Sequence, residues 1–385
     1  MNKNAKQKPL IRVQGFDDAW EQRKLSNIVD VCSGRDYKHL NDGDIPVYGT
    51  GGYMLSVSEA LSEKDDAIGI GRKGTIDNPF ILRAPFWTVD TLFYCVPKDN
   101  YDLNFTYCVF QNINWKSKDE STGVPSLSKT TINNIEVMTP TPAEQKKIGD
   151  YFTALDNLIT LHQRELEKII SVRKAMIERM FPQGGSNVPA VRFGQYKQPW
   201  NFCRFSQIFK ERHVVDTISK EYPQLAFTIE EGVIRPEDKK TNKRDFLIID
   251  KATKKYLRTE YNDIIYNPAN VIYGAIHRNS FGKGCVSPIY KIFYTDQDSS
   301  FMECIVRNPS FIKAISRSME GTVKKLRTLK PESFLEMGAY IAPTIDEQRQ
   351  IGEFFCQLDR LIELENKELE KIKHVKTACL EKMFV

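Results

Sequence analysis

One stretch of the sequence has the residue types and spacing of a phosphate-binding loop. Residues 69–74 read Gly-Ile-Gly-Arg-Lys-Gly and fit the pattern G-x-G-x-x-G, whose glycines let the backbone approach a dinucleotide at the start of a helix. The residues that follow are rich in β-branched types and reach Pro79, which does not suit a helix. We therefore favour a basic turn in which Arg72 and Lys73 contact phosphates or bases, with a plain surface hairpin as the alternative.

Two further stretches are similar to fragments of enzyme motifs. Residues 77–80 read Asp-Asn-Pro-Phe, which is close to an adenine methyltransferase signature but lacks its second proline. Residues 236–240 read Pro-Glu-Asp-Lys-Lys, as in some nucleases, but they lie in a polar run typical of a loop. The chain has five histidines, and none has the spacing of metal ligands. The sequence therefore predicts no catalytic site, no metal site and no cofactor bound by this chain.

Basic and polar side chains instead gather in two variable regions. Lys and Arg bind phosphates, while Arg pairs with guanine and Asn with adenine in the major groove. The formal net charge of +5 permits a polyanionic partner. Each of these residues could also be an ordinary solvated surface residue. The candidate DNA contacts are Arg35, Tyr48, Thr50, Arg72, Lys73, Lys129, His277, Arg278, Asn279, Lys283, Lys324 and Lys325.

Length and composition indicate a globular protein of more than one domain. The chain has 385 residues, of which 41% are hydrophobic and 27% charged. No stretch has the roughly 20 apolar residues of a membrane span, and the first ten residues contain no apolar signal core. The eight cysteines include no CxxC pair, which favours reduced thiols. We expect a cytoplasmic protein.

The elements that must position these residues are revealed by a duplication. Residues 140–181 and 343–384 align without a gap at an offset of 203, and 22 of the 42 aligned positions are identical. An opening segment with Arg12 and Trp20 matches a second one with Arg192 and Trp200 at an offset of 180. The chain therefore consists of two head-to-tail halves, and the variable region of the second half is longer by 203 − 180 = 23 residues.

The long repeats predict helices of roughly 40 residues each, because both begin with a capping-box pattern, Thr141 to Glu144 and Thr344 to Glu347. Apolar residues recur every seven positions with an additional row beside them, which favours an antiparallel coiled coil of the two helices with surface left for another protein. The alternative is that each helix covers the core of its own domain. The proposed coiled-coil and partner positions are Ile148, Phe152, Leu155, Leu158, Ile159, His162, Leu166, Ile169, Ile351, Phe355, Leu358, Leu361, Ile362, Glu365, Leu369 and Ile372.

One pair of these positions is polar. His162 and its repeat equivalent Glu365 lie near the middle of their helices, so they would meet if the helices paired antiparallel about their midpoints. We expect them to form a single polar layer that fixes the register.

The variable regions have the pattern of mixed α+β domains. The fold class is therefore α+β, with two globular domains separated by two long antiparallel helices and an internal pseudo-two-fold repeat. The expected boundaries are 1–140 for the first recognition domain, 141–185 for the first helix and linker, 186–342 for the second recognition domain and 343–385 for the second helix. Expected strands fall at 45–48, 67–70, 87–95, 246–250, 263–266, 271–273 and 290–294, and expected short helices at 101–111 and 309–318.

Several motifs stand out together: Trp20 and Trp200 in the opening segments, the glycine turns at 48–53 and 71–74, and the helix starts Glu144-Gln145-x-x-Ile148-Gly149 and Glu347-Gln348-x-x-Ile351-Gly352. On these motifs the chain resembles the specificity subunits of type I restriction–modification systems over essentially its whole length. The second variable region departs from the glycine-turn pattern of the first and has residues 276–282, Ile-His-Arg-Asn-Ser-Phe-Gly, in its place.

The resemblance implies a non-catalytic protein that binds double-stranded DNA. Each variable region would read one half of a bipartite, asymmetric site, and the paired helices would set the spacer and dock two methyltransferase subunits. S-adenosylmethionine would be bound by the methyltransferase partner, and ATP and Mg by a motor–nuclease restriction subunit. A self-contained methyltransferase or nuclease, a coiled-coil scaffold, and the specificity chain of a fused methyltransferase–nuclease remain as alternatives.

Overall fold

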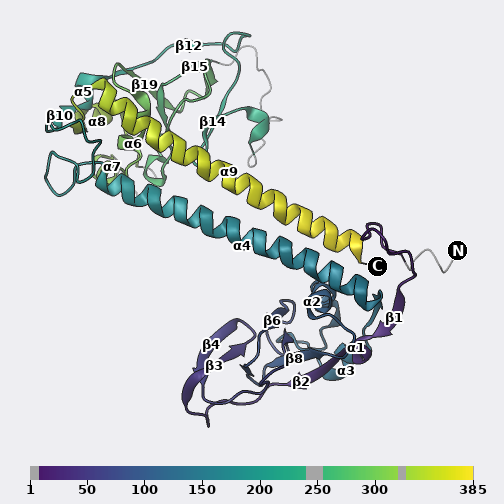
Figure 1. Ribbon diagram of the computed structural model, residues 1–385. Coiled ribbons are helices and arrows are strands. Elements are labelled where there is room, and N and C mark those ends of the chain that lie inside the picture. The colour runs from purple at the N-terminus through teal and green to yellow at the C-terminus, as the bar shows by residue number, and fades with distance from the viewer. Residues whose placement is uncertain (1–7, 240–254, 320–326, 385) are drawn as a thin grey trace. The chain divides into compact units, whose positions relative to one another are not determined.

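The computed structural model describes residues 8–239, 255–319 and 327–384. It divides into two compact units: unit 1 comprises Met1–Arg164 and Asn366–Val385, and unit 2 comprises Glu165–Glu365. Two long helices, α4 (Pro142–Arg179) and α9 (Ile345–Met383), each contribute to both units (Figure 1). Their 38 and 39 residues confirm the predicted lengths. Among the described residues, no helix is long and apolar enough to cross a membrane.

Unit 1 is built on a four-stranded antiparallel sheet with the order β2-β8-β5-β6. The strands are β2 (Val29–Ser33), β8 (Leu92–Pro97), β5 (Ala67–Gly71) and β6 (Phe80–Leu82). β5 reads Ala-Ile-Gly-Ile-Gly and is buried along its whole length, as suits a central strand. A second sheet joins β3 (Asp42–Gly49), β4 (Gly52–Val57) and β7 (Trp87–Thr88).

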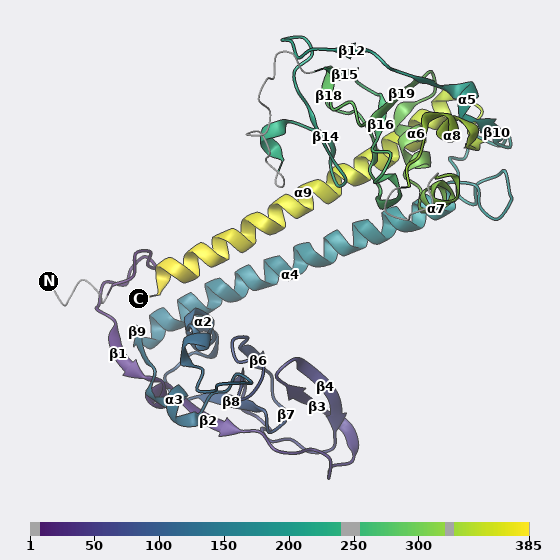
Figure 2. The same cartoon turned by 180° about the vertical axis from the view of Figure 1, so that it is seen from behind.

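Short helices and a terminal ribbon complete unit 1. The helix α2 (Leu103–Asn112) lies beside α4, and both views show it on the same side as the sheet (Figure 2). β1 (Glu21–Lys24) pairs with β9 (Glu136–Thr139), which leads into α4. The remaining elements are α1 (Leu25–Ile28), η2 (Trp115–Lys118) and α3 (Lys129–Asn134).

Unit 2 has a central four-stranded sheet with the same strand order as that of unit 1, but its outer strands are arranged differently. Its central sheet has the order β11-β19-β16-β17, formed by β11 (Phe209–Glu211), β19 (Lys291–Thr295), β16 (Ile264–Tyr266) and β17 (Ile276–Arg278). β10 (Asn201–Arg204) pairs with β20 (Gly338–Ile341) as β1 does with β9. Its helices are α5 (Phe205–Ile208), α6 (Ser299–Val306), α7 (Pro309–Ser318) and α8 (Pro331–Glu336).

Among the described residues, the outer strands of unit 2 are arranged differently from the second sheet of unit 1. One sheet has the order β12-β15-β18, and a separate hairpin pairs β13 with β14. The segment 271–273, expected as a strand, is instead the turn η5 (Val271–Tyr273), which Gly274 closes with a φ of 90°. The expected strand at 246–250 lies outside the described residues. The outer elements are β12 (Val215–Asp216), β13 (Ala226–Thr228), β14 (Gly232–Ile234), η3 (Pro236–Asp238), β15 (Tyr256–Thr259) and β18 (Gly284–Val286).

Each unit has the same four-ring aromatic cluster, and the end of one long helix completes it. In unit 1, Phe384 lies 6.1 Å from Trp20, 5.7 Å from Phe105 and 6.1 Å from Phe152 between ring centroids. In unit 2, Phe181 takes the equivalent place. The aromatic cluster of unit 1 is thus completed by the residue just after α9, and that of unit 2 by a residue just after α4.

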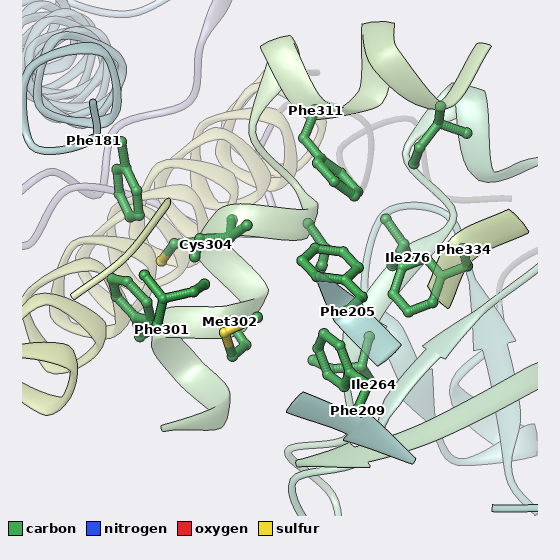
Figure 3. Packing of buried hydrophobic residues seen from close by; sticks show 14 of the residues in the cluster. Phe181, Phe205, Phe209, Ile264, Ile276, Phe301, Met302, Cys304, Phe311 and Phe334 are labelled. Atoms are coloured by element: carbon green, nitrogen blue, oxygen red, sulfur yellow. The ribbon is translucent and has the colours of Figure 1, made fainter. Parts of the chain in front are cut away.

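Figure 3 shows Phe181 beside Phe301 in the core of unit 2. Farther along the same core, Phe205 and Phe334 lie 5.0 Å apart between their ring centroids. Large aromatic side chains therefore continue from the long helices to the central sheet, which holds the sheet rigidly against them.

The identical residues at the two helix starts bind the opening segments. Arg12 donates to both carboxylate oxygens of Glu144 at 2.8 Å, and Arg192 donates to Glu347 at 2.5 and 2.8 Å. The predicted reciprocal capping box is therefore wrong in its glutamate half, because each carboxylate binds an arginine instead. Both glutamates are fully buried, so the arginines compensate charges that would otherwise be costly to bury.

The next residues fix a domain helix against each long helix. The Gln145 side chain accepts from the backbone N–H of Asp102, and Gln348 accepts from that of Asp298; these two aspartates are the N-caps of α2 and α6. A Cβ at Gly149 would lie 2.4 Å from the Asp102 carboxylate, and one at Gly352 would clash in the same way. Glycine therefore permits the close approach of the helices.

Candidate nucleic-acid interface

The topology of unit 1 brings several basic residues to one edge of its central sheet. β2 and β5 are both antiparallel to β8, so they run in the same direction and end where β8 begins. Arg35 follows the end of β2, and its backbone N–H donates to Thr88 O at 2.9 Å. Arg72 follows β5 directly, and its N–H donates to Thr91 O at 2.8 Å. Sequence-distant residues are thereby aligned beside one short segment.

Two other segments join this edge. The chain at 125–127 lies along the turn after β5, with Gly74 N donating to Pro125 O and Leu127 N donating to Arg72 O. This places Lys129 at the start of α3 close by. The tip of the β3–β4 hairpin also reaches the turn, since a Cβ at Gly74 would lie 3.9 Å from the Thr50 hydroxyl.

We call Arg35, Arg72, Lys73 and Lys129 the basic edge of unit 1. All four side chains are exposed, and none forms an ion pair with a carboxylate among the described residues. Arg72 lies over the Phe93 ring, with 5.8 Å from its guanidinium carbon to the ring centroid, and its Nη1 donates to Asp90 O at 3.4 Å. Four cations without a protein counter-ion provide the charge that phosphate binding requires.

The glycine pattern at 69–74 serves the turn itself. A Cβ at Gly71 would lie 2.0 Å from Thr75 O, and Gly74 has a φ of 90°. Among the described residues, β6 and not a helix follows this segment, so the segment lacks the helix start that a dinucleotide-binding loop requires. The glycines let the chain reverse tightly and hold Arg72 and Lys73 at the edge.

Tyr48 is only partly available. It lies on β3 with its ring centroid 6.3 Å from that of Tyr53 and 6.0 Å from that of Phe80. Tyr53, which sequence reasoning left out of the candidate contacts, is 63% exposed near the hairpin tip. Its position beside a glycine turn could have identified Tyr53 from the sequence as a candidate DNA contact.

Two of the candidates in unit 2 are interior residues. His277 is 4% exposed and its Nε2 lies 2.7 Å from Ile229 O, while burial lowers the pKa of His277 to about 4. Asn279 is fully buried, and its amide nitrogen donates to Thr259, Glu260 and Gly282. Buried side chains with satisfied hydrogen bonds cannot reach a DNA groove. We therefore leave both out of the proposed DNA contacts.

The other candidates in unit 2 are engaged elsewhere or not described. Arg278 pairs with Glu303 of α6 at 3.3 Å and also donates to Asn262. Lys283 is exposed but pairs with Glu221 at 2.7 Å. Lys324 and Lys325 lie outside the described residues. The sequence suggested that residues 276–282 take the place of the turn at 71–74. The strand order contradicts this, because residues 276–278 form β17, which occupies the position of β6 in the sheet, whereas the turn at 71–74 begins at the end of β5.

The coiled-coil positions divide into buried and exposed sets. Ion pairs join the two long helices within each unit: Asp156 with Lys376 at 2.6 Å in unit 1, and Asp359 with Arg173 at 2.5 Å in unit 2. The two pairs are equivalent in the repeat, because Asp156 aligns with Asp359 and Arg173 with Lys376 at the 203-residue offset. The alignment of the repeats could therefore have indicated both ion pairs. Ile148, Phe152, Leu155, Ile351, Phe355 and Leu369 are buried, Leu158 and Leu361 are exposed, and Ile159, His162, Leu166, Ile169, Leu358, Ile362, Glu365 and Ile372 are intermediate.

The expected polar layer stays a prediction, because His162 belongs to unit 1 and Glu365 to unit 2. No group of three His, Cys, Asp or Glu side chains that could hold a metal ion occurs among the described residues.

Comparisons with known proteins show which family this chain resembles. Residues 17–170 match the family model of the type I restriction modification DNA specificity domain. The chain is similar to the type I restriction enzyme MjaVIII specificity subunit of Methanocaldococcus jannaschii, with 23% identity in an alignment of 282 residues that covers 68% of this chain and 64% of that protein. It is also similar to the putative type I restriction enzyme MjaX specificity subunit of the same organism, with 23% identity over 65% of this chain and 59% of that protein.

The match thus spans less than two thirds of the length of these relatives. Among solved structures, the S subunit of a type I restriction–modification system from M. genitalium has a TM-score of 0.70 at 14% identity, over 98% of this chain and 99% of that one. This likeness shows a shared fold, including the α+β domains and the long helices.

Proposed function

We propose that this chain, which belongs to the specificity subunits of type I restriction–modification systems, binds double-stranded DNA sequence-specifically and catalyses no reaction itself. The observation that carries the proposal is the basic edge of unit 1, which lies within the segment that matches the DNA specificity domain. Its four cations would bind phosphates and position the turn and hairpin tip against base edges. We also place the protein in the cytoplasm.

Each unit would read a different half of a bipartite, asymmetric site. The central sheets of the two units share one strand order, whereas the outer sheets differ. A common core held against the long helices by the same aromatic cluster, with divergent outer strands, suits two readers with different base preferences. The long helices would set the number of unread base pairs between them.

The long helices would also dock two methyltransferase subunits, which bind S-adenosylmethionine. The exposed apolar residues Leu158, Leu161 and Val172 of α4 have exposed equivalents at Leu361, Leu364 and Val375 of α9. Two nearly identical apolar surfaces suit two copies of one partner. A motor–nuclease subunit that uses ATP and Mg would join the same assembly.

The experiment that tests DNA binding compares two lysines at opposite ends of β5. Lys73 follows the strand on the basic edge, and Lys64 precedes it; both are exposed. The affinity of the purified chain for duplex DNA is measured by fluorescence anisotropy at several salt concentrations. We expect Lys73→Glu to weaken binding and reduce the slope of log K against log salt by about 1, and Lys64→Glu to change neither. Equal effects of the two variants would refute a localised interface.

A further inference from the structure

The strand order of unit 2 defines an edge that corresponds to the basic edge of unit 1. β11 and β16 are both antiparallel to β19, as β2 and β5 are to β8. In unit 1, Ile68 pairs with Cys95, and in unit 2 Ile264 pairs with Phe293. This register places residues 267–270 where unit 1 has its turn at 71–74. The corresponding edge is therefore where β11 and β16 end and β19 begins.

Backbone hydrogen bonds outside the sheet give the same correspondence. Leu127 N donates to Arg72 O in unit 1, and Leu329 N donates to Pro268 O at 3.0 Å in unit 2. After these leucines come α3 in unit 1 and α8 in unit 2. The residue at the end of each accepts a backbone hydrogen bond from the short helix α1 or α5: Leu25 N donates to Ile135 O, and Phe205 N donates to Met337 O. The segment at 328–330 thus stands beside the turn as 126–128 does.

The corresponding edge of unit 2 contains a surface groove of about 420 Å³. His213 and Lys291 lie at the ends of β11 and β19, and Lys330 lies just before α8. The groove is lined by His213, Lys291, Thr328 and Lys330 together with Glu211 and Glu332. Lysine and threonine donate to phosphates, and carboxylates accept from the cytosine amino group in the major groove.

This groove has a different character from the basic edge of unit 1. It mixes cations with carboxylates, whereas the unit 1 edge presents four cations. A mixed set of donors and acceptors suits contact with base edges as well as phosphates, and different sets in the two units suit two unlike half-sites. Of the segment 277–283, His277 and Asn279 are buried and face the interior of the unit, so this segment offers fewer accessible polar groups than the groove.

We infer that unit 2 contacts duplex DNA through the groove lined by His213, Lys291 and Lys330, and not through residues 277–283. The inference rests on the proposed DNA-binding function. It assigns the second half of the recognition surface to residues that neither the glycine-turn pattern nor the basic clusters of the sequence had indicated.

The test uses the full chain and a pool of mixed-sequence duplex DNA. Lys291→Glu and Lys330→Glu are compared with Lys283→Glu, a matched charge reversal at an exposed lysine of the same unit, by anisotropy titration over a range of salt. We expect each of the first two to weaken binding by about tenfold and to lower the salt slope by about 1. Lys283→Glu should stay within about twofold of the unaltered chain.

Two further controls distinguish a loss of DNA binding from a loss of folding. Lys291 is half-buried, so Lys291→Gln provides a neutral variant that keeps much of the side-chain stem and should lose less affinity than Lys291→Glu. Unfolding midpoints identify any variant that is simply destabilised. If Lys73→Glu weakens binding while Lys291→Glu and Lys330→Glu do not, the groove is not the interface and the inference is overturned. If none of these variants matters, the proposed function fails with it.

Discussion

Replacing Phe181 with alanine tests whether residues beyond the end of α4 complete the core of unit 2. The Phe181 side chain is 5% exposed, and its ring centroid lies 5.7 Å from Trp200, 5.7 Å from Phe301 and 6.0 Å from Phe355. A buried Phe→Ala change costs about 3–5 kcal/mol, because it removes the transfer free energy of the ring and leaves a cavity. This range already includes the loss of the three aromatic contacts, each of which is worth about 0.5–1.5 kcal/mol beyond the buried area.

We therefore expect Phe181→Ala to reduce the free energy of unfolding of unit 2 by about 4 kcal/mol. The assay is native-state hydrogen exchange, which reports each unit separately where a single global transition would not. The amides of α6, which contains Phe301, should lose protection, while those of α2 in unit 1 should keep it. Ile170→Ala is the control, since Ile170 lies on α4 and is 47% exposed. A loss below about 1 kcal/mol, or equal losses in α2 and α6, would show that Phe181 does not complete the core of unit 2.

Two more predictions concern the helix starts, and both are measured by native-state hydrogen exchange, in which the amides of α6 report on unit 2 and those of α2 on unit 1. Glu347→Gln should destabilise unit 2 by about 3 kcal/mol, because it leaves the buried Arg192 without a counter-charge, whereas Glu353→Gln, an exposed change on the same helix, should have little effect. Gly149→Ala should destabilise unit 1 by about 1–3 kcal/mol, because the new Cβ would lie 2.4 Å from the Asp102 carboxylate. Gly123→Ala, where nothing lies within 4 Å of the new Cβ, is its control, and equal stability of the two glycine variants would contradict a close helix approach.

The sequence predicted the long helices well because their signal is repeated. Identity at a constant offset marks positions that both copies need, and the structure shows what they do: Glu144 and Glu347 bind arginines, and Gly149 and Gly352 admit a neighbouring helix. The arginine partners could have been found too, since Arg12 and Arg192 are identical at the 180-residue offset. Reading the glutamates as helix caps considered only local spacing and missed a partner 132 residues away.

The candidate site was predictable in unit 1 and not in unit 2. In unit 1, glycines at positions 71 and 74 indicate a turn, and the basic residues Arg72 and Lys73 lie within it, so the sequence alone identified both the turn and its candidate DNA contacts. In unit 2, the equivalent turn contains no basic residue, and the cations reach the edge from β19 and from the segment before α8. Only the strand register reveals this, because His277 and Asn279 look like polar surface residues until the sheet is formed around them.

Sequence recognition by this chain is tested most directly by a map of methylated adenines in cells that contain the methyltransferase partner with the unaltered chain, with the Lys73→Glu chain, or with no chain. We expect a bipartite motif whose methylation requires the chain and is weakened by Lys73→Glu. The same motif methylated at the same level in the absence of the chain would show that the chain does not direct methylation.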